Sequence, residues 1–381
     1  MRPFTCTAFA LLAFLAATVP GRAADPILPP FDPDATRLAI GRQIAFGPCP
    51  EPPAPIVDMS GLQSRYDPKD PTQSKVDPER DRRDKERSVA PTKLVTDVDK
   101  LADRFAISLP ANMQMAACVG HKIAVWARAN ALTQNVDQND RLGRHQAIMS
   151  QAWYGSGLSS ALVKIGGFAA MPREDADAIK PWLQRMAATV KAEYTPPFSW
   201  MIPSNNHKYW AGYFLAVTAA LYNDAELYKF SRKILDDAFE DIGADGMIAK
   251  EMARGPRSLG YQQFAILPIV AMTVQAERNG VPPSAKQYQA LDRMMAFTAE
   301  AAQNPQAIEV RLQVKQEPAN RSFDFSWIDM ILPSLKKRNP DLAAKLEPIV
   351  TAPRMRPAWH IFLGGDVTAA YNPTVLARSP Q

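Results

Sequence analysis

From about Thr92 onward, apolar residues recur at the three- and four-residue spacing of α-helices, and this pattern limits the fold more than any other feature of the chain. Almost no stretch alternates apolar and polar residues with a period of two, as a half-buried strand would. We therefore predict an all-α fold of antiparallel helix pairs, either stacked as a solenoid or closed into a toroid. No sequence repeat of fixed period is visible, which weakens the solenoid interpretation.

The predicted helices end at ordinary helix-stop signals, such as the pair Asn279-Gly280. The chain after Trp359 is predicted to be non-helical, because residues 363–368 (Leu-Gly-Gly-Asp-Val-Thr) are rich in turn formers. The predicted helices are 95–107, 111–132, 145–165, 175–193, 209–221, 226–239, 259–278, 286–303, 325–336 and 341–348.

Residues 1–24 have the composition of a secretory signal peptide. Arg2 supplies the positive charge, residues 8–19 form an apolar stretch too short to span a bilayer, and small residues surround a cleavage point near Ala23 or Ala24. No later stretch reaches about 18 uncharged apolar residues, so we expect no membrane insertion of the mature chain. The predicted location is the periplasm.

Loss of this leader removes Arg2 and Arg22, which leaves 42 of the 44 basic residues against 39 acidic ones. This mild excess is far from the profile of a nucleic-acid-binding protein. It suits an acidic partner only where the positive charge is concentrated in one place. Apolar residues make up 46% of the chain, so we expect a sizeable core rather than disorder.

The segment 25–91 is predicted to be irregular, because it is rich in proline at its start and has no apolar period up to about Arg87. Long loops in compact enzymes are often lids, so the part around Ser64-Arg65-Tyr66-Asp67 is interpreted as a lid loop, with a plain surface loop as the alternative. The charged run 77–87 mixes both signs and is interpreted as a solvated surface. The predicted divisions are thus the leader 1–24, the irregular segment 25–91 and a helical domain 92–381 with a non-helical tail.

Two cysteines remain after the leader and Cys6 are removed. Cys49 lies in the irregular segment and Cys118 in a predicted helix. An exported pair is most simply explained as one disulfide, which would attach the irregular segment to the first helices; two free thiols are the alternative.

Residues 204–210 (Ser-Asn-Asn-His-Lys-Tyr-Trp) follow a turn at 201–203 and form the start of a strongly apolar helix. Their amides, imidazole, ammonium and aromatic rings contribute little to a core but suit a sugar acid. Asn205 or Asn206 can be explained as an N-cap, although a cap does not require both. A lone His is more often structural, but the polar neighbours of His207 favour a functional role.

A second polar cluster lies at residues 250–264. Arg254 and Arg257 precede another apolar helix, where the helix dipole disfavours positive charge. Either Glu251 compensates these arginines, or they hold a bound anion.

These motifs resemble the alginate lyases of polysaccharide lyase family 5. The similarity is carried by Asn-Asn-His-x-Tyr-Trp, followed by Asp-Gly-x-x-x-x-Glu-x-x-Arg-x-x-Arg-x-Leu-x-Tyr. Further family elements recur in order over most of the mature chain, which makes the set more specific than any single motif. They are Cys49-Pro50, Ser64-Arg65-Tyr66-Asp67, the region of Cys118 and Trp126, His145 with Trp153, Phe325-Ser326-Trp327 and residues 363–367.

The resemblance implies an incomplete (α/α)6 toroid whose central cleft binds a polyuronate. It places Tyr66 on a lid loop, with Arg65 where the family usually has Lys. Asn206 and His207 match the pair that handles the uronate carboxylate and the reacting centre, and Arg257 matches the cleft arginine. The resemblance also implies a disulfide between Cys49 and Cys118. The residues expected to contact the substrate are Arg65, His145, Trp153, Asn205, Tyr209, Trp210, Arg254, Gln262 and Phe264.

One position departs from the family pattern. The family places its catalytic Tyr seven residues after the cleft Arg, and this chain has Phe264 there, with Gln262-Gln263 where His-Asn is usual. Tyr261 matches an earlier family Tyr. Three explanations compete: Tyr261, Tyr66 or His207 takes over proton transfer, on a different uronate polymer; the enzyme is slow; or the chain binds the polymer without cleaving it.

β-Elimination removes the proton on C5 of a uronate and expels the oxygen on C4. Asn206, Arg254 and Arg257 are predicted to bind the carboxylate, which makes the C5 proton more acidic. His207 and a tyrosine, Tyr66 or Tyr261, are predicted to share the proton transfers. No metal-ligand spacing is visible, so no metal or cofactor is expected.

We therefore predict an exported polysaccharide lyase acting on alginate, polymannuronate or a related β-linked polyuronate. The alternative is a non-catalytic or weakly active polyuronate-binding protein of an exopolysaccharide export system, and Phe264 is the feature that separates the two. A glycoside hydrolase would need paired carboxylates, and Glu251 is the only acid in either polar cluster.

Overall fold

The computed structural model describes residues 25–196, 205–356 and 358–377. The predicted signal peptide 1–24 and the turn at 201–203 lie outside these residues. Within the described residues the chain is almost entirely helical, and the only strands there are the short β1 (Trp359–His360) and β2 (Gly365–Asp366), which pair antiparallel. The prediction of an all-α chain is confirmed. No helix in these ranges is long and apolar enough to cross a membrane.

The α-helices of the described residues follow in chain order. They are α1 (Ala35–Ile40), α2 (Pro78–Ala106), α3 (Met113–Arg128), α4 (Arg141–Lys164), α5 (Arg173–Glu193), α6 (Asn206–Tyr222), α7 (Ala225–Glu240), α8 (Ala249–Met252), α9 (Ser258–Arg278), α10 (Ala285–Gln303), α11 (Gln306–Leu312), α12 (Ser326–Arg338), α13 (Pro340–Thr351), α14 (Val367–Tyr371) and α15 (Pro373–Ala377).

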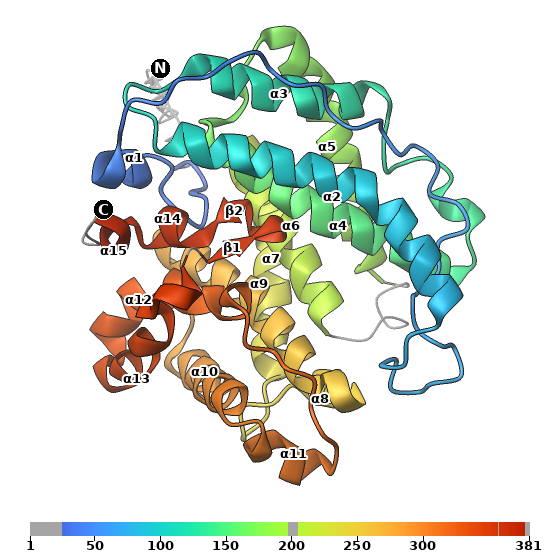
Figure 1. Cartoon of the computed structure of the whole chain (residues 1–381), viewed down its shortest axis with the longest axis vertical. Coiled ribbons are helices and arrows are strands. Elements are labelled where there is room, and N and C mark those ends of the chain that lie inside the picture. Colours follow the sequence, from blue (N-terminus) through green and yellow to red (C-terminus); the bar gives the residue numbers. More distant parts are fainter. Residues whose placement is uncertain (1–24, 197–204, 357, 378–381) are drawn as a thin grey trace, which may run out of the picture.

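Helices α2, α4, α6, α9 and α12 form an inner row in which each packs against the next. Helices α3, α5, α7, α10 and α13 pack beside them as an outer row (Figure 1). The sequences explain this division, because α6 and α9 bury side chains all around, whereas α7 buries one apolar stripe and leaves charged residues exposed. The alternation is that of an incomplete α/α toroid, as predicted.

The irregular segment is shorter than predicted, because α2 begins at Pro78 rather than near residue 92. Asp77 caps this helix by accepting hydrogen bonds from the backbone N–H groups of Glu79 and Arg80. Arg82 forms ion pairs with Glu79 and with Glu86, one helical turn apart in each direction. This first part of α2 has no apolar period because its side chains are largely exposed, so periodicity did not reveal it. The solvated character predicted for the charged run was right.

The tail was also predicted to be non-helical, and this is wrong in part. Asp366 accepts a hydrogen bond from the N–H of Ala369 and so caps the short helix α14. Asp103 of α2 accepts hydrogen bonds from Trp359 Nε1 and from the N–H of Asp366. Figure 1 shows this red C-terminal segment between α2 and α12, where it joins the two ends of the inner row.

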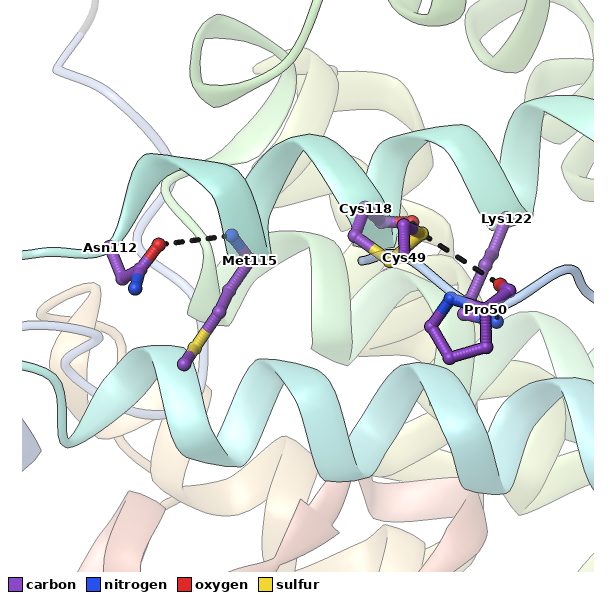
Figure 2. The surroundings of a disulfide bond; sticks show 6 residues. All are labelled: Cys49, Pro50, Asn112, Met115, Cys118 and Lys122. Atoms are coloured by element: carbon purple, nitrogen blue, oxygen red, sulfur yellow. Dashed lines mark hydrogen bonds between the residues drawn. A yellow bond between two sulfur atoms is a disulfide. The ribbon is translucent and has the colours of Figure 1, made fainter. Parts of the chain in front are cut away.

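The predicted disulfide between Cys49 and Cys118 is confirmed, with the two Cα atoms 5.6 Å apart (Figure 2). It attaches the irregular N-terminal segment to α3. Two hydrogen bonds extend this attachment: Lys122 Nζ donates to the carbonyl of Pro50, and Trp126 Nε1 donates to that of Pro53 at 2.9 Å.

We predict that replacing both Cys49 and Cys118 with alanine lowers the free energy of unfolding by about 4 kcal/mol, because the cross-link closes a long loop in the unfolded chain. The loop spans a sequence separation of 69 residues. Urea denaturation followed by circular dichroism measures the change. A reductant should destabilise the original chain by a similar amount and leave the alanine variant unaffected; equal stability of the two chains without reductant would contradict the prediction.

Candidate active site

Residues 64–77 form an ordered loop, named here the lid loop, rather than a featureless surface segment. Tyr66 and Val76 pair as an isolated antiparallel bridge, and the N–H of Asp77 donates to the carbonyl of Arg65. The carboxylate of Asp70 accepts hydrogen bonds from the Thr72 side chain and from the N–H groups of Lys75, Ser74 and Thr72. These bonds hold the pKa of Asp70 well below its usual value, so its charge organises the loop at neutral pH.

The lid loop contacts the start of α9 through its tyrosine. The hydroxyls of Tyr66 and Tyr261 are 2.6 Å apart, and Arg257 Nη1 donates to the Tyr66 hydroxyl at 3.0 Å. Arg254 Nη2 donates to the carbonyl of Gln73 at 2.8 Å, and its guanidinium lies 3.7 Å from the centre of the Tyr261 ring. Arg65 lies at the edge of this group, where it pairs with Asp81 of α2.

These contacts explain how two positively charged arginines can lie just before the start of a helix. Arg257 pairs with Glu317 at 3.2 Å, and Arg254 donates to the lid loop and lies against aromatic faces, although its buried Nε has no hydrogen-bond partner among the described residues. No ion pair joins Glu251 to either arginine among the described residues, although the charges of Glu251 and Arg254 do interact, so both sequence-based explanations stay open. Arg254 and Arg257 lie together beside the lid loop, and positive charge at one place favours an anionic ligand.

Glu251 instead holds the start of α6. Its carboxylate accepts a hydrogen bond from the Asn206 N–H at 2.7 Å, and the Asn206 side-chain amide donates to both of its oxygens. Asn205 is the N-cap, because its Oδ1 accepts from the N–H of His207. Burial raises the pKa of Glu251 to about 7, although the hydrogen bonds from Asn206 oppose the shift.

His207 lies at the end of a hydrogen-bonded chain of side chains. Its Nδ1 is 3.1 Å from Nε2 of His145, whose Nδ1 is 3.1 Å from a carboxylate oxygen of Glu193. Arg144 pairs with the other oxygen of Glu193. Burial, reinforced by the neighbouring His145 and Arg254, lowers the pKa of His207 well below its usual value. The imidazole of His207 is therefore neutral at neutral pH, with one ring nitrogen that carries no proton.

Phe264 lies in an aromatic cluster. Its ring centre is 5.0 Å from that of Trp210 and 5.8 Å from that of Trp153, and Phe362 and His360 complete the group. Trp210 stacks on His360 with an angle of 11° between the rings. A side chain without a hydroxyl fits this environment because it needs no hydrogen-bond partner.

Two cavities meet at these residues. One, of about 290 Å³, is lined by His207, Arg254 and Trp153; the other, of about 390 Å³, is lined by Arg257, Arg321 and His360. Arg65, Tyr66, Tyr261 and Phe264 line both. The hydrogen-bonded pair Tyr66–Tyr261 thus stands between two parts of one cleft.

Burial raises the pKa of Tyr261 well above its usual value, against the opposing effect of Arg254. Tyr261 is therefore protonated at neutral pH. In the described ranges, no group of three or more His, Cys, Asp or Glu side chains is arranged to hold a metal ion.

The structure does not place every predicted residue in the cleft. Tyr209, Trp210 and Gln262 are fully buried. Tyr209 donates to Asp241, and the Gln262 side chain bonds to the backbone of Gly246 and Ile248. These three residues support the cleft wall instead of contacting a ligand, and Asn205 and Asn206 are committed to the start of α6. His145 contributes through His207, and Trp153 lines the first cavity.

Sequence reasoning missed several residues of the site. Glu193 is the last residue of a helix and is separated by 48 residues from His145, so nothing in its local sequence marks it. The cleft residues Gln73, Glu317, Arg321 and Phe362 come from loops and from the tail. The only sequence signal for Phe362 was its proximity to the Gly364-Gly365 turn.

Comparison with known proteins agrees with this geometry. The alginate lyase family model matches residues 61–308. A polysaccharide lyase of Stenotrophomonas maltophilia is 26% identical over 325 residues, which are 85% of this chain and 91% of that protein. An alginate lyase of Pseudomonas aeruginosa is 24% identical over 374 residues, which are 95% of each chain.

Solved structures match as well. A histidine-to-alanine variant of alginate lyase A1-III, complexed with a tetrasaccharide, superposes with a TM-score of 0.72 at 20% identity, covering 94% of this chain and 98% of that one. The same enzyme from Sphingomonas species A1 matches with a TM-score of 0.66 at 19% identity, covering 91% and 97%. The toroid, its cationic cleft and these relatives define the class as a polysaccharide lyase. The chain belongs to the alginate lyase family.

We predict that Glu251→Gln flattens the dependence of stability on pH. The folded-state pKa of about 7 lies above the unfolded value of 4.5, so stability from this group is complete below about pH 4.5 and is lost as the pH rises to about 7. The slope in this range is at most about 1.4 kcal/mol per pH unit. Urea denaturation at several pH values measures it.

The control for this experiment is Glu317→Gln, which neutralises an exposed glutamate. Only Glu251→Gln should reduce the slope between pH 4.5 and 7; a constant loss of stability at every pH, caused by the altered bond to Asn206, does not affect the slope. Identical slopes in all three proteins would show that Glu251 is ionised throughout.

Proposed function

We propose that this protein is an exported, metal-independent lyase that cleaves alginate or a related uronic-acid polymer by β-elimination, leaving a 4,5-unsaturated uronate end. One observation carries the proposal: an imidazole, a phenol and a nearly buried guanidinium line the same cavity. These groups belong to His207, Tyr261 and Arg254. A base, an acid and a cation for the carboxylate are what the reaction requires.

In the proposed reaction, Arg254 neutralises the carboxylate attached to C5 in the first cavity, and Arg257 adds positive charge from the neighbouring cavity. Asn206 contributes to this step only indirectly, because its side-chain N–H groups are occupied by Glu251. Positive charge beside the carboxylate stabilises the enolate that forms as the C5 proton leaves. The guanidinium of Arg254 is nearly buried, and the weak screening in such a place strengthens the effect.

His207 accepts the C5 proton on its free ring nitrogen. The electron pair of the C5–H bond forms the C4–C5 double bond, and the bond between C4 and its oxygen breaks. Tyr261 donates its proton to that oxygen, with Tyr66 hydrogen-bonded behind it. The base gains one proton and the acid loses one, so exchange with solvent restores both after product release.

The two cavities on either side of Tyr66 and Tyr261 are proposed as neighbouring subsites. A polymer that occupies both passes the tyrosine pair, so the lid loop must open to admit a chain and close to complete the site. Arg321 lies at the far side of the second cavity, where it packs on Phe323 with its guanidinium 4.1 Å from the ring centre. Such a surface suits a sugar ring beside a carboxylate.

The periplasm is proposed as the location, on the basis of the leader sequence 1–24 and of the disulfide, which oxidising compartments favour. In that compartment a uronate lyase would clear stray polymer during exopolysaccharide export. The acidic polysaccharide is the proposed partner of the cleft.

Phe264 favours a second candidate, a polyuronate-binding protein of the export system with little or no activity. The residue removes a hydroxyl from the junction of the two cavities, while the arginines remain in place. Binding without turnover is the property that separates this candidate from the first.

We predict an absorbance rise at about 235 nm, from the unsaturated product, with at least one of mannuronan, guluronan and glucuronan. His207→Ala should lower kcat by roughly 10²- to 10⁴-fold, which is the usual contribution of a general base. The matched control is His121→Ala, a histidine far from the cleft beside the disulfide. EDTA should leave the rate unchanged. Measurable binding of a polymer with no absorbance rise for any of the three would contradict the lyase proposal and favour the binding protein.

We predict that Phe264→Tyr raises kcat at least about tenfold, because it restores a hydroxyl at the junction of the cavities, where acid–base groups contribute about 10²-fold or more. Phe362→Tyr is the matched control, since it adds the same hydroxyl to the same aromatic cluster. Steady-state rates on the preferred polymer measure both. An unchanged or lower kcat in Phe264→Tyr would show that His207 and Tyr261 already form the complete acid–base pair.

A further inference from the structure

The hydrogen-bonded chain behind His207 joins three helices. Glu193 is the last residue of α5, His145 lies in the first turns of α4, and His207 lies in the first turn of α6. The side chain of Glu193 is only 5% exposed, yet it carries a carboxylate between Arg144 and His145. A buried carboxylate is costly unless it is paired, so its position requires both partners.

The direction of each hydrogen bond follows from the charge of Glu193. Hydrogen bonding to His145 and the charge of Arg144 outweigh the effect of burial and lower the pKa of Glu193, so the group is ionised and can only accept. Nδ1 of His145 must therefore carry a proton. In the neutral ring Nε2 is then bare and accepts the Nδ1–H of His207. The remaining nitrogen of His207, Nε2, is left without a proton.

We propose that Glu193 is a positioning residue that, acting through His145, fixes His207 as the tautomer whose bare Nε2 is the proton acceptor. The use of this nitrogen as a base rests on the proposed lyase function, whereas the tautomer itself does not. Carboxylate–imidazole pairs fix ring tautomers in the same way at metal sites and in hydrolases.

The same hydrogen-bond directions show which change would remove the bare Nε2 of His207. Protonation of His145 puts a hydrogen on its Nε2, which then donates to Nδ1 of His207 and moves the His207 proton to Nε2. The charged or titratable groups around the pair are Glu193, Arg144 and Tyr194 beside His145, and Arg254 beside His207. A second proton on the His145 ring would therefore remove the bare nitrogen of His207 and with it the proposed proton acceptor.

His360 provides an internal reference with the opposite tautomer. Its Nδ1 accepts a hydrogen bond from the N–H of Phe362 at 3.2 Å, so its proton lies on Nε2. The chain has only four histidines, which makes their ring nitrogens separable in one spectrum.

The test is ¹⁵N NMR of the histidine rings in the chain produced without a polyhistidine tag, at a pH where the rings are neutral. His145 and His207 should both show the Nδ1–H form and His360 the Nε2–H form. In Glu193→Gln, the amide oxygen still accepts from Arg144, and the amide N–H₂ donates to Nδ1 of His145. Both His145 and His207 should therefore change to the Nε2–H form. Asp137→Asn is the matched control, since it removes an exposed partner of Arg144 and should leave the tautomers unchanged.

The kinetic counterpart is a loss of kcat in Glu193→Gln of roughly 10- to 100-fold, as for other carboxylates that orient a histidine. KM should remain unchanged, because Glu193 does not contact the substrate. The acidic limb of the pH–rate profile should shift as well, which loss of structure alone would not cause.

A proton on Nε2 of His207 in the original chain would overturn the proposal, and this outcome does not depend on the folding of any variant. Unchanged tautomers in Glu193→Gln would overturn it too. If the tautomers are as stated but no polymer is cleaved, the arrangement of Glu193, His145 and His207 stands and the lyase proposal falls.

Discussion

The site depends on one buried carboxylate. Glu251 is fully buried between the start of α6 and the segment before α9, and in that environment an ionised or protonated carboxyl group must be hydrogen-bonded. The N–H and side-chain amide of Asn206 supply those bonds, which fixes the first turn of α6 against α8. His207 is the next residue after Asn206, and Arg254 follows Glu251 by three. One polar contact therefore brings His207 and Arg254 to the same cavity, although they are far apart in the chain.

Much of this convergence could be predicted from the sequence. Two polar clusters at the starts of apolar helices pointed to one cleft, and the structure brings His207, Arg254 and Tyr261 together there. The sequence could not separate Asn205 from Asn206, because either side chain can cap a helix and only the backbone geometry decides. It also assigned Tyr209, Trp210 and Gln262 to the ligand. Inner-row helices bury all of their faces, so an aromatic or polar residue there packs against the scaffold even when it is one turn from the cleft.

Other predictions were wrong or missing because the local sequence carries no signal of the feature. The start of α2 is stabilised by its cap and by ion pairs between successive turns, and these leave no apolar period to detect. Glu193 acts through contacts between three helices, which a single sequence cannot reveal. The lid loop is the opposite case: Asp70 followed by Thr72 and Ser74 is a local pattern that forms side-chain-to-backbone hydrogen bonds, yet the sequence analysis interpreted this segment only as irregular.

In the proposed reaction, Phe264 stands where the family pattern has a tyrosine, so two different groups carry out the two proton transfers. A single phenol can both take and return a proton only if its pKa is low enough for it to ionise. Tyr261 does not meet this condition, since burial outweighs the charge of Arg254 and keeps its proton in place. Burial acts on His207 in the opposite sense and removes its proton. Desolvation of one cavity thus leaves His207 neutral and Tyr261 protonated, although it makes the first a weaker base and the second a weaker acid. The hydrogen bond between Tyr66 and Tyr261 connects Tyr261 to the lid loop, while His207 is held through His145 and Glu193 by the helices behind it.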